Sequence, residues 1–294
     1  MADSYAHRYS ARKALELAHY NPRDIDSFIL GSNGPDPLFF YQMYNPFKKY
    51  HMSKLGSVMH NEKTGLFLKN MFRFARTDTQ KDYCLGFLCH YSMDSLIHPF
   101  VYYITQAYGS PYNISAGHSY FESALDSKLS VEVSGQPAPE VKYYCPDMSK
   151  MQLEQIATLF KKAVEATYKD FDFPRSEYIQ AFKDLKIIKN FFYSPNRTHY
   201  WPAAVIEKIG HFEEGYVTSK VQPCIKEMPD MPFWKNLAVD LYTTESLDDI
   251  INHANYLSAR CINLGLEYFN GIITVNDLAE SLGNKSYETG VVVD

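Results

Sequence analysis

The sequence is poor in cysteine, and this limits the classes of protein to which it can belong. Five cysteines occur in 294 residues, an odd number, and no two have the CxxC spacing of redox or zinc-ribbon motifs. A secreted scaffold held by disulfides is therefore excluded, and we interpret the cysteines as reduced thiols in a reducing compartment. Cys84 and Cys89 lie close to His90 but lack ligand spacing to it, so we interpret both as packing residues.

Several motifs of enzymes and exported proteins are also missing. The sequence has no glycine-rich phosphate loop, no His-Asp dipeptide of the HD-type phosphohydrolases, and no motif that supports a serine or cysteine nucleophile. It contains no apolar run of about 18 residues, as a membrane span requires. The first residues, MADSYAHRYSARKALELAHY, lack the apolar segment and cleavage site of a signal peptide. We therefore expect a cytoplasmic protein.

The overall composition is that of a globular protein. Hydrophobic residues make up 46% of the chain and charged residues 21%, which is enough apolar material for a substantial core. The formal net charge of -5 gives no general attraction to nucleic acid, so we expect no stable nucleic-acid binding. We predict one all-α domain over residues 1–294, with metal-cluster helices in 1–130 and further packing helices and loops in 131–294.

Hydrophobic periodicity and helix-breaking residues predict a mainly α fold. Ser149 with Gln152, and Ser246 with Asp249, have the spacing of capping boxes that begin helices. The predicted helices cover residues 5–19, a short stretch ending at 30, and then 53–76, 77–98, 115–129, 149–168, 175–193 and a long helix from 246.

The intervening segments are expected to be irregular. Two glycines and two prolines in GSNGPDPLFF (31–40) favour a loop, and we expect irregular structure in 131–148 and 194–236. The last dozen residues are expected to form a loose tail. Pro99 lacks a backbone N–H and disfavours helical geometry at the residue before it, so we expect a kink or break after His98.

The most informative stretch lies between residues 86 and 122. His90, Asp94 and His98 are spaced by four residues, which places them within roughly 80° of one another on a helix. His118 and Glu122 form a second pair with the same spacing. An amphipathic helix with polar residues on its exposed side is the alternative, but five imidazole and carboxylate groups in this pattern indicate ligands for zinc or a similar metal.

Other ligand-type residues precede this stretch. The full set contains five histidines, two aspartates and one glutamate: His7, Asp36, His60, His90, Asp94, His98, His118 and Glu122. Eight groups exceed the needs of one tetrahedral zinc, so we predict two or three zinc ions, with Asp94 able to bridge two of them.

In order, chemistry and local sequence, these residues resemble the zinc-dependent phospholipase C family, which shares its fold with the S1/P1 nucleases. The matching segments within residues 1–130 are AHRYS, GPD, MH, GFLCHYSMDSLIHP and GHSYFE. The resemblance implies a single-domain, multi-helix fold around a metal cluster. It assigns four residues to one zinc: Asp36, His60, His90 and Asp94. It assigns three residues to a second zinc: His98, His118 and Glu122.

A third zinc in the family uses a mature N-terminal tryptophan together with residues that correspond to His7 and Asp94. This sequence begins MADSY and has no tryptophan there. We therefore expect the third site to be empty, completed by water or weak.

The function implied is hydrolysis of a phosphate ester by metal-activated water, as in phospholipase C, on a small-molecule or phospholipid head-group substrate. Transient contact with a membrane surface is expected. Asp36 is the candidate catalytic residue, because it lies on a constrained loop and can orient or deprotonate the water; it can equally be a ligand. The alternatives are an S1/P1-type nuclease and a non-catalytic metal-binding protein that keeps the fold.

Overall fold

The structure is a computed structural model that describes residues 4–108, 114–142, 144–223 and 231–293. The described residues are mainly helical, which confirms the predicted fold class. Their α-helices are, in chain order, α1 (Ser4–Ala18), α2 (Ile25–Gly31), α3 (Pro37–Phe40), α4 (Met52–Asn61), α5 (Thr64–Phe74), α6 (Asp78–Tyr108), α7 (Ile114–Ser134), α8 (Lys150–Thr167), α9 (Arg175–Phe192), α10 (Tyr200–Ile209), α11 (Leu247–Phe269) and α12 (Val275–Leu282).

Short elements connect these helices. Three are single 3₁₀ turns, η1 (Ala138–Glu140), η2 (Pro195–Arg197) and η3 (Thr218–Lys220), and two strands, β1 (Trp234–Asn236) and β2 (Leu241–Thr243), form an antiparallel pair. Among the described helices, none combines the length and apolar character needed to cross a lipid bilayer.

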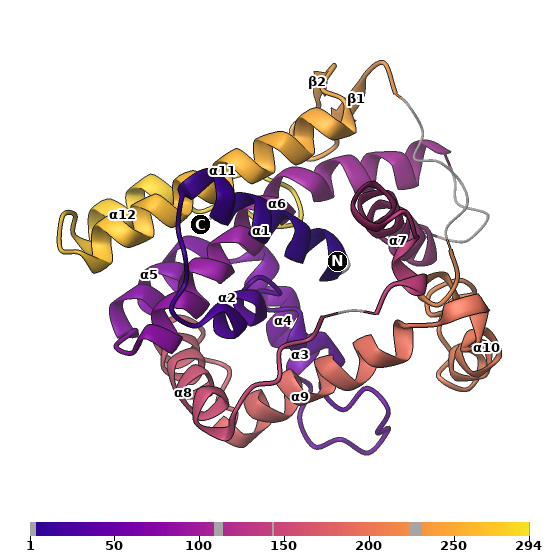
Figure 1. Ribbon diagram of the computed structural model, residues 1–294, viewed down its shortest axis with the longest axis horizontal. Coiled ribbons are helices and arrows are strands. Elements are labelled where there is room, and N and C mark those ends of the chain that lie inside the picture. The colour runs from indigo at the N-terminus through magenta and orange to yellow at the C-terminus, as the bar shows by residue number, and fades with distance from the viewer. Residues whose placement is uncertain (1–3, 109–113, 143, 224–230, 294) are drawn as a thin grey trace.

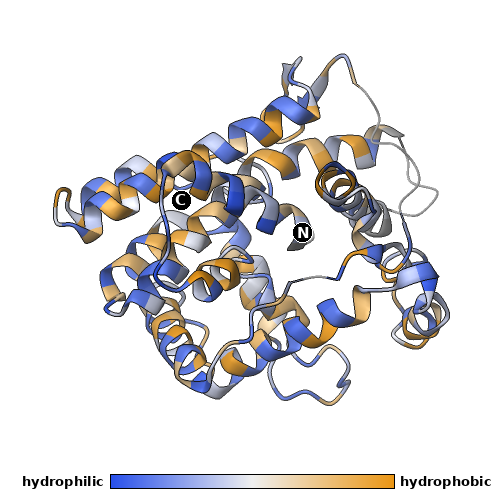
Figure 2. Cartoon of the chain, in the orientation of Figure 1, coloured by the Kyte–Doolittle hydropathy of each residue, from blue (hydrophilic) through white to orange (hydrophobic). Residues whose placement is uncertain are grey.

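The long helix α6 is the centre of the molecule. It packs against α1, α2 and α7 from the N-terminal half and against α11 from the C-terminal half. Figure 1 shows α11 and α12 along one side of the structure and α8 and α9 along the opposite side. Apolar and polar residues lie on different faces of the helices (Figure 2). In α8 the predicted capping box is present, and the apolar residues Leu153, Ile156 and Phe160 are buried.

Glycines allow α2 to lie unusually close to α6. A Cβ atom on Gly31 would lie 2.3 Å from the carbonyl oxygen of Tyr83, and one on Gly86 would lie 2.0 Å from that of Phe28. Gly34 follows in a left-handed conformation (φ 53°), and a Cβ there would lie 2.1 Å from the ring of His90. This crossing therefore positions the loop that carries Asp36 directly against α6.

The structure corrects the prediction of a break at Pro99. Helix α6 continues through Pro99 to Tyr108. Proline cannot donate to the carbonyl oxygen of Ser95. The backbone at Gly290 packs there instead, where a Cβ would lie 2.4 Å from that oxygen. The backbone of Gly290, far from Pro99 in the sequence, thus packs against the carbonyl group that the proline leaves without its helical donor.

Five other expectations about helix boundaries and irregular segments were wrong. The predicted helix 53–76 is two helices, α4 and α5, because Lys63 adopts a left-handed conformation (φ 51°) between them. The loop 31–40 contains α3, the segment 194–236 contains α10 and β1, and α7 extends past residue 129 to Ser134. The last residues are not a loose tail, since Ser286 and Tyr287 are buried.

We predict that Gly86→Ala destabilises the protein by about 2 kcal/mol or more, because the added methyl group must push α2 away from α6. Urea denaturation followed by circular dichroism measures this change. Gln106→Ala, an exposed position on the same helix, is the control and should leave the free energy of unfolding almost unchanged. Equal stability of the two variants would contradict the close crossing.

Candidate metal centre

The first group of ligand-type side chains comes from three elements. Asp36 precedes α3, His60 lies in the last turn of α4, and His90 and Asp94 lie one turn apart on α6. One ligand atom from each of these four buried residues lies within 4.8 Å of the others. The close packing of Gly31 on α6 and the left-handed turn at Gly34 bring Asp36 next to His90.

The distances within this group suit a tetrahedral metal. Nε2 of His90 lies 3.0 Å from Oδ2 of Asp94, and Nε2 of His60 lies 3.3 Å from Oδ1 of Asp36. Nε2 of His60 is also 3.7 Å from Oδ2 of Asp94. A zinc ion about 2.0–2.2 Å from each ligand in a tetrahedron separates its ligand atoms by about 3.3–3.6 Å.

A second group consists of His98 on α6 with His118 and Glu122 on α7. Oε1 of Glu122 lies 2.9 Å from Nε2 of His118 and 3.3 Å from Nε2 of His98. His98 and His90 are two turns apart on one helix, yet they belong to different groups. Asp94 lies between them, with its Oδ2 3.8 Å from Nδ1 of His98.

Hydrogen bonds to carbonyl groups fix two of the histidine rings. Nδ1 of His60 donates to the carbonyl oxygen of Gly56 at 2.7 Å, and Nδ1 of His98 donates to that of Tyr287 at 2.9 Å. In the neutral ring each Nε2 then carries a lone pair, and it faces a carboxylate that can only accept. A proton or a metal cation between the two groups resolves this conflict, and outer hydrogen bonds of this type are typical of metal-bound histidines.

The buried carboxylates of the site are stabilised by positive charge. Burial opposes ionisation of Asp94 and Glu122. The charges of His90, His98 and His7 nevertheless hold the pKa of Asp94 well below its usual value. The pKa of Glu122 is also well below its usual value, and hydrogen bonds from His118 and His98 contribute to this. For His98, burial is outweighed by the charge of Asp94 and the hydrogen bond to Glu122, which raise its pKa to about 9. Burial lowers the pKa of His7 to about 4, so this ring is neutral and able to bind a metal.

Several buried polar atoms at the site have no hydrogen-bond partner within the described part of the chain. They are both ring nitrogens of His7 and of His90, Nε2 of His60, Oδ1 of Asp36 and both carboxylate oxygens of Asp94. Buried polar groups are rarely left without partners. Nitrogen and oxygen atoms clustered in this way fit zinc, whose protein ligands are imidazole, carboxylate and thiolate groups.

The comparison with protein families agrees with this geometry. A family model described as zinc-dependent phospholipase C matches residues 6–171, more than half of the chain. The chain belongs to the zinc-dependent phospholipase C family. No curated protein and no solved structure matches it significantly. The resemblance seen in the sequence is confirmed, and a zinc-dependent site with two groups of candidate ligands is supported.

Seven of the eight residues that the sequence predicts as metal ligands fall into the two groups. His7 is the exception: its Nε2 lies 3.3 Å from Oδ1 of Asp94 and 3.9 Å from Oδ2 of Asp36, at the edge of the first group. A third ion on His7 and Asp94 stays a prediction, as do the ligand roles of all eight residues. Residues 1–3 lie outside the described part of the chain.

The C-terminal segment also contributes to the site, which was not predicted from the sequence. The backbone N–H of Tyr287 donates to the carbonyl oxygen of His60 at 2.7 Å, and its ring packs edge-on against His60 and His90. The carboxylate of Glu288 accepts a hydrogen bond from the hydroxyl group of Tyr102. Burial raises the pKa of Glu288, but the charges of His98 and His60 outweigh burial and lower it. No spacing or motif in residues 284–293 signals these contacts, and the family match ends at residue 171.

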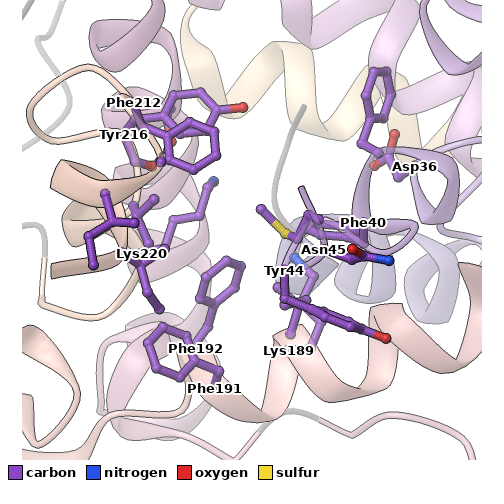
Figure 3. A pocket seen from close by; sticks show the side chains of 18 of the residues that line it. Asp36, Phe40, Tyr44, Asn45, Lys189, Phe191, Phe192, Phe212, Tyr216 and Lys220 are labelled. Atoms are coloured by element: carbon purple, nitrogen blue, oxygen red, sulfur yellow. Dashed lines mark hydrogen bonds between the residues drawn. The ribbon is translucent and has the colours of Figure 1, made fainter. Parts of the chain in front are cut away.

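A pocket of about 570 Å³ opens beside both groups. Asp36, His118 and Glu122 line it at the metal centre, and the remaining walls are largely apolar and aromatic. Figure 3 shows Asp36, Phe40 and Tyr44 on one side, Phe212, Tyr216 and Lys220 on the other, and Phe191 and Phe192 below. A pocket of this size holds a ligand much larger than a phosphate group.

We predict that His118→Ala loses roughly one zinc ion per chain and retains the rest, because His118 contributes to the second group alone. Elemental analysis after zinc reconstitution and removal of free metal measures the content. His253→Ala is the control, since this histidine is exposed and outside both groups. Loss of all zinc from the His118 variant would mean that the two groups act as a single interdependent centre.

Proposed function

We propose that the protein is a phospholipase C-like hydrolase that cleaves a phosphate diester with a metal-activated water. The observation that carries this proposal is the position of two groups of buried ligand-type residues at one wall of a large apolar pocket. Family membership supports a zinc-dependent, phospholipase-like function. When bound, zinc polarises a phosphoryl oxygen and lowers the pKa of a bound water.

Residues of both groups would hold the metal, and their positions suggest a division of work. Of the first group, His60, His90 and Asp94 are fully buried, whereas Asp36 lines the pocket. A carboxylate at this boundary can hold an attacking water in place and accept its proton. Asp36 is therefore the proposed base, and its closeness to His60 also allows it to serve as a ligand.

The second group faces the same pocket. His118 and Glu122 both line it, and the side chain of His118 is 16% exposed. Substrate can therefore reach this group directly. The surrounding walls include Met43, Ile188 and Ile206 beside the aromatic rings, and these aliphatic side chains suit the alkyl or acyl groups of a lipid. A phospholipid accordingly fits this pocket better than the nucleic-acid substrate of a nuclease.

Contact with a membrane surface is part of the proposal. Segments that form the pocket carry large exposed apolar side chains: Phe47 is 91% exposed, Ile209, in the last turn of α10, 74%, and Trp201, in the first turn of the same helix, 76%. Ile209 lines the pocket, and so do both neighbours of Phe47 in the chain, Pro46 and Lys48. Tryptophan and phenylalanine insert readily at the boundary between head groups and acyl chains. This face would place the pocket against the lipid surface that supplies the substrate.

We predict that Asp36→Asn lowers hydrolysis of bis-p-nitrophenyl phosphate by about 10²–10⁴-fold while most of the zinc remains bound, because the amide cannot accept the proton. Turnover and metal content are measured on the same preparation. Loss of one zinc in parallel with activity would instead assign Asp36 chiefly to metal binding. Hydrolysis at the wild-type rate would disprove its catalytic role, and no hydrolysis by either protein would favour a non-catalytic metal-binding protein.

We also predict that Phe47→Ala combined with Trp201→Ala lowers hydrolysis of phospholipid vesicles about tenfold, because less apolar surface enters the bilayer. Hydrolysis of the water-soluble ester should be unchanged. Ile272→Ser is the control: this residue is 70% exposed but lies in the turn between α11 and α12, far from α10 in Figure 1. An equal loss on both substrates would refute membrane contact at this face.

A further inference from the structure

The last described residues, 284–293, form a small hairpin that packs against the metal centre. Lys285 and Val292 pair in an antiparallel bridge, and the chain reverses direction in a turn at residues 287–289. Gly290 follows this turn in a left-handed conformation (φ 68°), which glycine adopts without strain. We call residues 284–293 the C-terminal hairpin. It lies beyond the segment that matches the family.

The tip of the C-terminal hairpin contacts one candidate ligand of each group through its main chain. The N–H of Tyr287 donates to the carbonyl oxygen of His60 at 2.7 Å, and the carbonyl oxygen of Tyr287 accepts from Nδ1 of His98 at 2.9 Å. The ring centre of Tyr287 also lies 5.4 Å from that of His60 and 5.6 Å from that of His90. Because a carbonyl oxygen only accepts, this contact leaves Nε2 of the neutral His98 ring with a lone pair for a metal.

The C-terminal hairpin is a surface element although its tip is buried. Within it only Ser286 and Tyr287 are buried, and Val292 is 70% exposed. Segments near a chain end open locally at a lower free energy than the helices of a core. The hairpin can therefore open while the helices stay packed, and opening removes the contacts of Tyr287 with both groups.

Gly290 is the position at which the C-terminal hairpin meets α6 most closely. A Cβ atom there would lie 2.4 Å from the carbonyl oxygen of Ser95 and 3.4 Å from the ring of Pro99. Since Pro99 has no N–H to donate to this carbonyl group, the backbone of the hairpin can pack against it. Any larger residue at position 290 must push the hairpin away from α6. The position therefore offers a way to displace the hairpin without changing a candidate ligand.

We propose that the C-terminal hairpin controls the retention of zinc: in its packed position it fixes the orientation of His98 and His60, and zinc is released when it opens. The inference requires zinc at the metal centre but not the proposed hydrolytic reaction. Linkage makes the effect reciprocal. A hairpin that strengthens zinc binding must itself be held more firmly when zinc is bound.

Gly290→Ala tests the proposal, and Gly271→Ala is the matched control. Both glycines are left-handed (φ 68° and 74°), so alanine strains the backbone at either position, but a Cβ on Gly271 meets no atom of the described chain within 4 Å. Zinc release from the loaded full-length proteins is followed with an excess of a chromophoric chelator. Gly290→Ala should release zinc about 10–100-fold faster than the wild-type protein, the range in which lost outer contacts weaken metal binding. Gly271→Ala should release it at the wild-type rate.

Asn284→Ala is a second variant, and it weakens the base of the hairpin without straining the backbone. The side chain of Asn284 accepts hydrogen bonds from the hydroxyl group of Thr64 at 3.0 Å and from the N–H of Gly65 at 2.7 Å. Its loss should also accelerate zinc release. Thermal unfolding verifies that each variant is folded, and Asn284→Ala decides if Gly290→Ala is not.

Hydrogen exchange of the unmodified protein measures the reciprocal effect. Zinc should slow the exchange of the amides of residues 286–290 by about tenfold or more. Helix α12 contains no candidate ligand, so its amides report any general stabilisation by the metal. A larger effect in the hairpin than in α12 supports the coupling.

Three results would overturn the proposal. They are zinc release at the wild-type rate from the folded hairpin variants, equal acceleration by the Gly271 control, and exchange in the hairpin that zinc slows no more than in α12. Hydrolysis of bis-p-nitrophenyl phosphate is measured in parallel. If no ester is cleaved but zinc and the hairpin are coupled, the proposed reaction fails and the control of zinc retention stands.

Discussion

Three buried carboxylates, Asp36, Asp94 and Glu122, are the constraint on which the rest of the structure depends. A buried ionised group is strongly unfavourable unless positive charge and hydrogen bonds compensate it. Histidines from α4, α6 and α7 are brought to these carboxylates, and α6 supplies members of both groups. Zinc held by residues of all three helices would add its binding free energy to the stability of their packing.

The candidate metal ligands come from one part of the chain, whereas the walls of the pocket come from two. All candidate ligands lie within or next to the segment that matches the family, residues 6–171, whereas α9, α10 and η3 lie beyond it. Lys189, Phe192 and Lys220 belong to this second part. The N-terminal part thus provides the candidate ligands and one wall of the pocket, and the C-terminal part provides the opposite wall.

The sequence predicted those features that depend on local periodicity. His90, Asp94 and His98, like the pair on α7, were recognisable because a helix repeats every 3.6 residues. Asp36 and His60 have no such spacing: their residue types made them candidates, and the resemblance assigned them to the same zinc as His90 and Asp94. The wrong predictions have other causes. At Pro99 and in the C-terminal segment, contacts with residues distant in the sequence decide the structure. At Lys63, a left-handed backbone conformation without glycine ends the helix. None of these features leaves a periodic signal in the sequence.

The hydrogen bond from His98 to the carbonyl oxygen of Tyr287 has a consequence for how the protein is made. The two residues are 189 positions apart. At about 5–20 residues per second, a ribosome needs about 10–40 s to synthesise the intervening chain. Throughout that interval the nascent α6 carries its histidines without the partner that fixes the tautomer of His98. A metal ion captured in that interval would therefore meet an incompletely oriented set of candidate ligands.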